Sequence, residues 1–303
     1  MFRKNKARQV LYALSLLVGI LLIVFFYKEG EKISAFYFVT SVNPLKKEIV
    51  EIEEKRLSPA QKIGSFVYVA IEALFENAKY VTALATPAAT PITIYPGVRN
   101  EEIAELLAKK MDWGNEEEKS FILLARANEG KFYPGTYVVT PDVKAVDLQK
   151  KMHNRFQEEV EERYKSGTTS VVSLETALNI ASIIQREAAG KKDMRLISGV
   201  IWNRLFADMS LDMDATLQYI RGDENVGWWP KVNPEDKKIK SPYNTYLNKG
   251  LPPAPIASPS ILAIEAAFNP RKTPCFFYLH DKKGNIHCSK TYEEHKHNID
   301  KYY

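Results

Sequence analysis

One carboxylic acid, Glu187, is a candidate for chemistry because it closes the apolar stripe of a predicted helix. Residues 173–190 read SLETALNIASIIQREAAG, with Ser173 as a candidate N-cap and Gly190 as a candidate stop. At about 100° per residue, one helix face carries Thr176, Ile180, Ile183, Ile184 and Glu187. A carboxyl held against isoleucine loses solvation of its charged form, which raises its pKa and suits it to act as a general acid. The alternative is a glutamate that turns to water or pairs with Arg186 or a lysine.

The other reactive residue types form no recognisable site in the sequence. No zinc-ligand spacing is matched by Cys288 together with His280, His287, His295 and His297. The sequence contains no glycine-rich phosphate loop and no Gly-x-Ser-x-Gly elbow, and Ser182 has no evident partner base. We therefore expect no metal and no cofactor, which leaves carboxylate chemistry as the enzymatic class. Cys275 and Cys288 flank a predicted hairpin turn, so a cross-strand disulfide and a pair of small buried side chains are the alternatives there.

The elements that follow the Glu187 helix are expected to build a cleft. A second helix is predicted over residues 193–207, and a loop with glycine, proline and two tryptophans covers residues 222–238. Loops of this length are uncommon unless they are functional. Residues 241–260 combine prolines with tyrosine and asparagine, so rings can stack and amides can hydrogen-bond in a sugar or peptide cleft; an ordered surface loop is the alternative. A short helix over 261–268 and a hairpin over 275–289 complete this part.

Residues 92–165 predict a smaller α+β module ahead of the cleft. A strand ends in a Pro-Gly turn at residues 96–97, and Asn100 can cap the helix that follows. A second helix, another turn and strand, and a long charged helix then lead to residue 164. Nothing in this module resembles a nucleophile or a metal site, so its expected role is binding or positioning.

The first residues predict a membrane anchor. Four basic residues, Arg3, Lys4, Lys6 and Arg8, precede an apolar run over residues 10–27, which is long enough to cross a bilayer as a helix. Because basic residues stay on the cytoplasmic side, residues 1–9 are expected in the cytoplasm and the rest of the chain beyond the membrane. A cleaved signal peptide is the alternative. Residues 28–91 are interpreted as a membrane-proximal segment and linker, which the proline-containing run TALATPAATP closes.

Length and composition fit this division. The chain has 303 residues, 45% hydrophobic and 26% charged, which is enough for one large domain or two modest ones. Its net charge of +5 is spread along the chain with acidic and basic residues mixed, so we expect no nucleic-acid partner. The predicted fold class is α+β, with a transmembrane helix, a small module over 92–165 and a mixed α+β catalytic domain over 171–303 in which a helix carries the catalytic glutamate.

Several ordered motifs together resemble the YceG-like family. They are EGKFYPGTY (129–137), ASIIQRE (181–187), VIWNRL (200–205), DATLQY (214–219), YNTY (243–246) and GLPPAPIASP (250–259). The resemblance implies a single-pass protein of the bacterial inner membrane whose enzyme domain is periplasmic or otherwise extracytoplasmic, with a LysM-like first module. It also implies endolytic murein lytic transglycosylase activity, in which the bond between N-acetylmuramic acid and N-acetylglucosamine is cleaved in nascent strands. That reaction leaves 1,6-anhydro ends and is suited to terminating strand elongation.

The resemblance places the catalytic acid at Glu187. The family's motif has two glutamates; Gln185 replaces the first, and its side chain lies about 200° around the helix from Glu187. The residues expected to line the cleft and bind substrate are Asn203, Asp214, Tyr243, Asn244, Thr245 and Tyr246. For Asp214, capping a helix or pairing with Arg204 is an alternative. Two further positions depart from the family: Ala215 stands where proline is usual, and His287 falls one residue after the family's histidine position, which Ile286 occupies.

The implied partners are peptidoglycan glycan strands, the lipid bilayer through the N-terminal helix, and peptidoglycan synthases. A single acid is sufficient for the implied reaction, since the sugar's own 6-hydroxyl replaces water as the nucleophile. Two other functions remain open from the sequence. One is a non-catalytic peptidoglycan-binding scaffold of the wall-synthesis machinery. The other is a water-using muramidase, for which Asp214 is the candidate second carboxylate.

Overall fold

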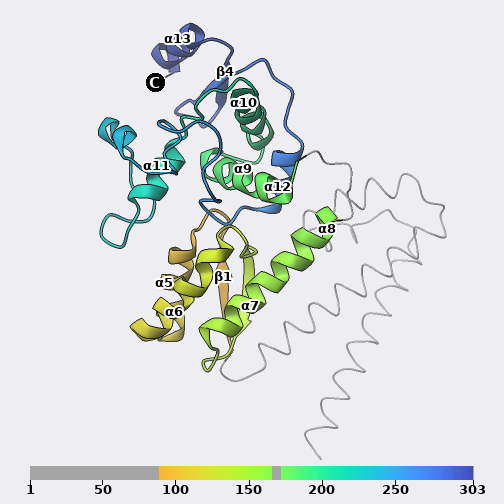
Figure 1. Cartoon of the computed structure of the whole chain (residues 1–303), viewed down its shortest axis with the longest axis vertical. Coiled ribbons are helices and arrows are strands. Elements are labelled where there is room, and N and C mark those ends of the chain that lie inside the picture. Colours follow the sequence, from red (N-terminus) through yellow and green to blue (C-terminus); the bar gives the residue numbers. More distant parts are fainter. Residues whose placement is uncertain (1–88, 166–171, 303) are drawn as a thin grey trace, which may run out of the picture. The chain divides into compact units, whose positions relative to one another are not determined.

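The computed structural model describes residues 89–165 and 172–302, which are drawn as coloured ribbon in Figure 1. The predicted cytoplasmic tail (1–9), the predicted transmembrane helix (10–27) and nearly all of the predicted linker (28–91) lie outside this range. Among the described residues, none of the helices combines the length and apolarity that a membrane span requires. The described residues all belong to one compact unit.

The first part of the described chain is a two-stranded sheet covered by helices. Strand β1 (Thr90–Ile94) pairs antiparallel with β2 (Gly135–Val139), with Ile92 opposite Tyr137. The helices are α5 (Asn100–Met111), α6 (Asn115–Ala125), α7 (Ala145–Phe156) and α8 (Glu162–Lys165), with a 3-10 turn at Arg126–Asn128 and a π-helical segment at Gln157–Glu161. Apolar side chains of the sheet and of α5–α7 form one core around Phe121 and Phe132. The predicted order of strand, helix, helix, strand and helix is confirmed.

The second part is organised around α9 (Leu174–Glu187), which packs against α10 (Met194–Phe206), α11 (Asp214–Arg221) and α12 (Ile261–Phe268) (Figure 1). Ser173 caps α9 as predicted, since its Oγ accepts the backbone N–H of Thr176 at 3.1 Å. The helix ends earlier than predicted, at Glu187, because Ala188 is already extended. Every residue from Ala177 to Ile184 is buried. The sequence predicted that only one face of this helix is buried, whereas neighbouring segments cover the stretch 177–184 on all sides.

The chain after α12 forms a hairpin and a final helix. Strand β3 (Phe277–His280) pairs antiparallel with β4 (Ile286–Ser289), and α13 (Tyr292–Tyr302) packs against both. A disulfide joins Cys275 to Cys288, which decides between the two alternatives left by the sequence. A short 3-10 helix, Pro234–Lys238, lies in the loop after α11.

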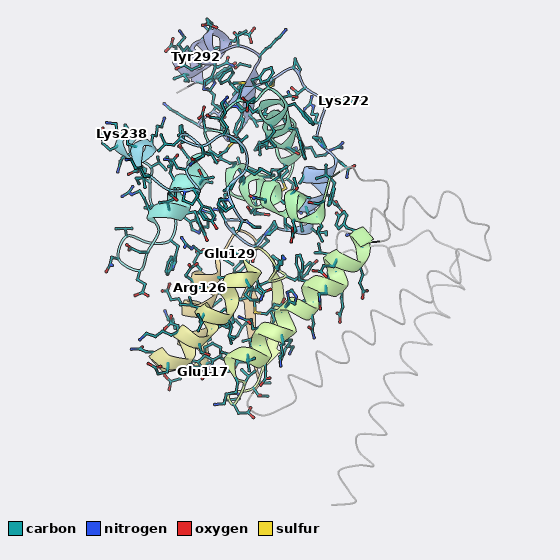
Figure 2. All side chains as sticks on the ribbon, in the orientation of Figure 1. Glu117, Arg126, Glu129, Lys238, Lys272 and Tyr292 are labelled. Atoms are coloured by element: carbon teal, nitrogen blue, oxygen red, sulfur yellow. A yellow bond between two sulfur atoms is a disulfide. The ribbon has the colours of Figure 1, made fainter. Side chains whose placement is uncertain are left out.

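The two parts are joined by backbone and side-chain contacts. The N–H of Gly97 donates to the carbonyl of Ser258, and the N–H of Ser258 donates to the carbonyl of Val98, both at 2.8 Å. Gly130 is required at its turn, since its φ is +75° and a Cβ there would lie 2.7 Å from the Cβ of Pro255. Figure 2 shows Arg126 and Glu129 close to that turn. These contacts hold the small module directly against the part that carries Glu187.

Candidate active site

Glu187 is the last residue of α9, and both of its carboxyl oxygens accept hydrogen bonds. The backbone N–H of Ala215 donates to Oε1 at 3.1 Å, and the hydroxyl of Tyr278 donates to Oε2 at 2.9 Å. Burial raises the pKa of Glu187, the two donors oppose that rise, and the nearby negative charge of Asp214 adds to it. A carboxyl with a raised pKa keeps its proton closer to neutral pH, which is the property required of a general acid.

The Ala215 donor exists because α11 begins at this point. The first N–H groups of a helix have no partner inside the helix, so they point outward with partial positive charge. Ala215 is the second residue of α11 and therefore offers its N–H to Glu187. A proline has no N–H. The departure at this position thus has a chemical consequence, since Ala215 makes a contact that a proline cannot make.

Asp214 lies at the start of α11 beside Glu187, and its partner is Tyr246. The Tyr246 hydroxyl donates to Oδ1 of Asp214 at 2.6 Å. The sequence left open a pairing of Asp214 with Arg204, but the carboxylate near Arg204 is that of Asp212, at 3.4 Å. Asp214 and Tyr246 are therefore the two predicted cleft residues that the structure brings next to the candidate acid.

The other predicted cleft residues make internal contacts. Tyr243 packs its ring against Tyr219, with centroids 5.0 Å apart. Thr245 is buried, and its Oγ1 accepts the N–H of Met213 at 3.0 Å. Asn244 is also buried, and its Nδ2 donates to the carbonyls of Lys237 and Ile239. Thr245 and Asn244 thus shape the loop that carries Tyr246.

Asn203 is tied to the segment that leads into β3. Its Nδ2 donates to the carbonyls of Thr273 and Cys275, both at 2.9 Å. The neighbouring Arg204 is 7% exposed and donates to the carbonyls of Phe276 and Leu211, both at 2.6 Å. The end of α10 therefore fixes both the approach to Tyr278 and the loop that leads to Ala215.

Sequence reasoning missed Tyr278, His280 and Asp193. Tyr278 and His280 are two residues apart in β3, so they lie on the same face of the hairpin. The Nε2 of His280 lies 3.2 Å from Oδ2 of the buried Asp193, just before α10. The sequence did contain one useful signal, the alternation of side chains along the predicted hairpin. It predicts that Tyr278 and His280 lie on the same face, but it does not show that this face is turned toward Glu187.

Gln185 and His287 point to other partners. The Oε1 of Gln185 accepts the N–H of Ser260 at 3.0 Å, so this side chain helps to hold the start of α12. His287 is opposite Leu279 in the hairpin, on the face away from Tyr278. Its Nε2 lies 3.0 Å from Oδ2 of Asp281, and its ring stacks on Tyr302. His287 therefore does not face Glu187.

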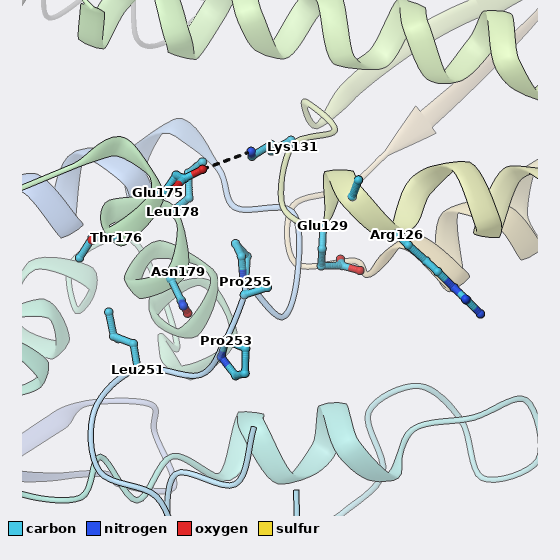
Figure 3. A pocket seen from close by; sticks show the side chains of 12 residues that line it. Arg126, Glu129, Lys131, Glu175, Thr176, Leu178, Asn179, Leu251, Pro253 and Pro255 are labelled. Carbon is cyan, nitrogen blue, oxygen red and sulfur yellow. Dashed lines mark ion pairs between the residues drawn. The ribbon is translucent and has the colours of Figure 1, made fainter. Parts of the chain in front are cut away.

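A separate cavity of about 330 Å³ lies between the two parts (Figure 3). Its walls are the turn after α6, the first half of α9 and the loop that contains Pro253 and Pro255. At its rim Lys131 lies 3.9 Å from Glu175. Glu187 does not line this cavity. Among residues 89–165 and 172–302, no three His, Cys, Asp or Glu side chains are grouped so as to hold a metal ion.

Comparison with known proteins identifies the family to which this mixed α+β fold belongs. Residues 42–301 match the model of the YceG-like family, and the chain belongs to that family. This confirms the resemblance seen in the sequence motifs.

Two curated relatives carry the name endolytic murein transglycosylase. The one from Bacillus subtilis (strain 168) is 36% identical over 175 residues, which cover 57% of this chain and 48% of the relative. The one from Streptococcus pneumoniae serotype 2 (strain D39 / NCTC 7466) is 31% identical over 174 residues, which cover 56% of this chain and 31% of the relative. The matches thus span less than half of each relative's length.

A solved structure supports the fold. The 2.6 Å crystal structure of a yceG-like protein from Listeria monocytogenes superposes with a TM-score of 0.62 at 27% sequence identity. The similarity covers 74% of this chain and 80% of the Listeria chain. The mixed α+β fold is therefore that of the family.

Proposed function

We propose that this protein is an endolytic murein lytic transglycosylase. The substrate is the glycan strand of peptidoglycan, and the bond cleaved is the one between N-acetylmuramic acid and N-acetylglucosamine. The observation that carries the proposal is the Glu187 carboxyl at the end of α9, which has a raised pKa and hydrogen bonds to Ala215 and Tyr278. The names of the curated relatives support the choice of substrate.

The mechanism uses one carboxyl in two steps. Protonated Glu187 first gives its proton to the glycosidic oxygen while positive charge develops at the muramyl C1. The C1–O bond breaks and the shortened strand leaves as an alcohol. The Glu187 carboxylate then removes the proton of the muramyl 6-hydroxyl, whose oxygen attacks C1 and closes the 1,6-anhydro ring. Glu187 ends the cycle protonated, and no water is consumed.

Asp214 and Tyr246 are proposed to contact the sugars next to the broken bond. The carboxylate of Asp214 is exposed and already accepts the Tyr246 hydroxyl, so the pair offers an acceptor and an aromatic face at one place. The negative charge of Asp214 also stabilises the positive charge that develops at C1. Tyr243 is proposed to extend this surface along the strand.

A water-using muramidase is the second candidate, because Asp214 is a carboxylate close to Glu187. In that reaction a water replaces the 6-hydroxyl, and the product has a reducing end. A non-catalytic scaffold that binds peptidoglycan is the third candidate. The raised pKa of Glu187 favours a catalytic role over this one.

The cellular setting is part of the proposal. The basic residues 3–8 and the apolar run 10–27 support a single-pass anchor in the bacterial inner membrane, with a cytoplasmic N-terminus and an extracytoplasmic enzyme. From that position the enzyme is proposed to act on nascent strands beside peptidoglycan synthases and to terminate their elongation. The module over 92–165 is proposed to bind or position the strand as a reduced LysM-like element.

Cleavage in water labelled with oxygen-18 tests the proposed function. The protein is incubated with purified glycan strands, and the new muramyl ends are identified by mass spectrometry. Lytic cleavage gives anhydro ends that contain no heavy oxygen. Ends that are 20 mass units heavier, by one heavy water, would instead establish the muramidase, and binding without any new ends would establish the scaffold.

A further inference from the structure

The two hydrogen bonds to Glu187 come from donors with different properties. The Ala215 N–H is part of the backbone, so it can only donate, and it is directed at Oε1. The Tyr278 hydroxyl can rotate, and it lies within reach of two acceptors: Oε2 of Glu187 at 2.9 Å and Sδ of Met213 at 3.5 Å. The two carboxyl oxygens are therefore not equivalent.

We propose, on the basis of the proposed function, that Ala215 and Tyr278 are positioning residues that assign different tasks to the two oxygens of Glu187. The fixed N–H keeps Oε1 as the carbonyl-like acceptor, so the transferable proton resides on Oε2. Tyr278 holds Oε2 toward the substrate and stabilises the negative charge that remains there after proton transfer. Neither residue touches the reacting sugar atoms in this scheme.

The energetic argument is that both bonds strengthen as the reaction proceeds. A hydrogen bond to a carboxylate is shorter and roughly twice as strong as one to a neutral carboxyl. Interactions that are stronger in the transition state than in the ground state are those that accelerate a reaction. Both donors are in place before charge develops, so the protein needs no reorganisation at the moment of proton transfer.

Tyr278 is suited to remain a donor throughout the cycle. Burial, followed by the charge of Glu187 and the hydrogen bond to it, raises the pKa of Tyr278 well above its usual value. The phenol therefore does not compete with Glu187 as an acid. When Oε2 carries the proton, Met213 Sδ offers the hydroxyl a weak alternative acceptor.

Other charged groups around Glu187 set the background for its titration. Asp214 on α11 raises the pKa of Glu187, and His280 on β3, which pairs with Asp193, lowers it. Arg186 precedes Glu187 on α9, and its guanidinium donates to the carbonyl of Gly97 and stacks on Trp229. Neither substitution replaces one of these groups, but Asp214 directly precedes Ala215 and the His280 ring lies 6.0 Å from that of Tyr278, so each donor variant is compared with a matched control.

Two substitutions remove one donor each. Ala215→Pro deletes the N–H in the first turn of α11, where proline is tolerated, and Ala215→Ser keeps the N–H as its matched control. Tyr278→Phe deletes the hydroxyl, and Tyr95→Phe makes the same change at an exposed ring. Circular dichroism establishes that each variant is folded.

The primary measurement is the titration of the Glu187 carboxyl by carbon-13 NMR, with Glu187→Gln used to assign the signal. Ala215→Pro and Tyr278→Phe are each expected to move the midpoint to higher pH, whereas Ala215→Ser and Tyr95→Phe keep the wild-type midpoint. In strand cleavage, Tyr278→Phe is expected to lower kcat about tenfold with little change in KM and to move the basic limb of the profile to higher pH.

Midpoints that stay in place, or move to lower pH, in both donor variants overturn the inference. A folded Tyr278→Phe variant with wild-type kcat overturns the role of Tyr278. The NMR titration needs no turnover, so it still decides the inference if the wild-type protein cleaves no strand. Failure of the proposed function and failure of this inference are therefore distinguishable.

Discussion

Replacing Arg204 by methionine is expected to lower the free energy of unfolding by about 3–5 kcal/mol. The Arg204 guanidinium is buried, and it donates at 2.6 Å to the carbonyls of Phe276 and Leu211 and at 3.2 Å to that of Ser210. Methionine keeps most of the apolar packing but leaves these carbonyls without a donor, at a cost of about 1–3 kcal/mol for each well-buried group. The two shortest bonds alone account for most of the expected loss.

Thermal unfolding followed by circular dichroism measures this loss. For a unit of this size, 1 kcal/mol corresponds to about 2–4 °C, so the midpoint is expected to fall by about 6–20 °C. Arg195→Met is the matched control, because Arg195 is exposed and donates only to the carbonyl of Asn269 among the described residues. We expect that control to cost less than about 1 kcal/mol. Equal losses in the two variants would refute the buried network as the reason for the effect.

Two further predictions concern stability. Burial raises the pKa of Glu129 to about 8, above its unfolded value, so the folded state holds a proton that the unfolded state has released between about pH 4.5 and 8. The free energy of unfolding should therefore fall as pH rises through that window and level off above it. Urea unfolding measured across this pH range should show a shallower decline for Glu129→Gln than for the wild-type protein. The same pH dependence in both proteins would contradict this prediction. Separately, reduction of Cys275–Cys288 should cost about 3 kcal/mol in thermal unfolding. The Cys275→Ala/Cys288→Ala variant is the control, because it has no disulfide and dithiothreitol should not move its unfolding midpoint. If dithiothreitol also leaves the wild-type midpoint in place, the second prediction is contradicted.

The sequence was sufficient for the features that depend on local patterns. The cap at Ser173, the helix that carries Glu187 and the hairpin around Cys275 and Cys288 each follow from spacing within one segment. Segment order also predicted the mixed α+β fold, since two strands separated by a pair of helices and followed by another helix were expected over 92–165. These are properties that neighbouring residues determine.

Contacts between distant segments were beyond that reasoning. Tyr278 reaches Glu187 across 91 positions, and nothing in its own segment distinguishes it from the other aromatic residues of β3. Asn203 and Asn244 were expected in the cleft from the family resemblance, and Asn244 also because amides can bind a sugar, but both side chains donate to backbone carbonyls. A polar residue that holds a loop and one that holds a ligand have the same sequence signature, so only the packed structure separates them.

The α9 stripe shows the same limit in another form. Periodicity placed Glu187 beside isoleucines, and that placement is correct. It did not indicate that Ala177, Leu178 and Asn179 are buried as well, because these residues lie outside the predicted stripe on the helix surface. That enclosure stops before the helix end, where residues 185–188 are only partly buried; the Glu187 carboxyl is covered there by Ala215 and Tyr278, which come from distant segments.

The most direct test of the account is the product analysis of Glu187→Gln beside the wild-type protein. Glutamine keeps the size of the side chain and removes the transferable proton, so the fold should be retained while kcat falls about 100- to 10,000-fold. The account predicts anhydro-ended fragments from the wild-type protein and almost none from the variant, at equal protein concentration and with matching circular dichroism spectra. Anhydro ends formed by Glu187→Gln at the wild-type rate would contradict the assignment of Glu187 as the catalytic acid.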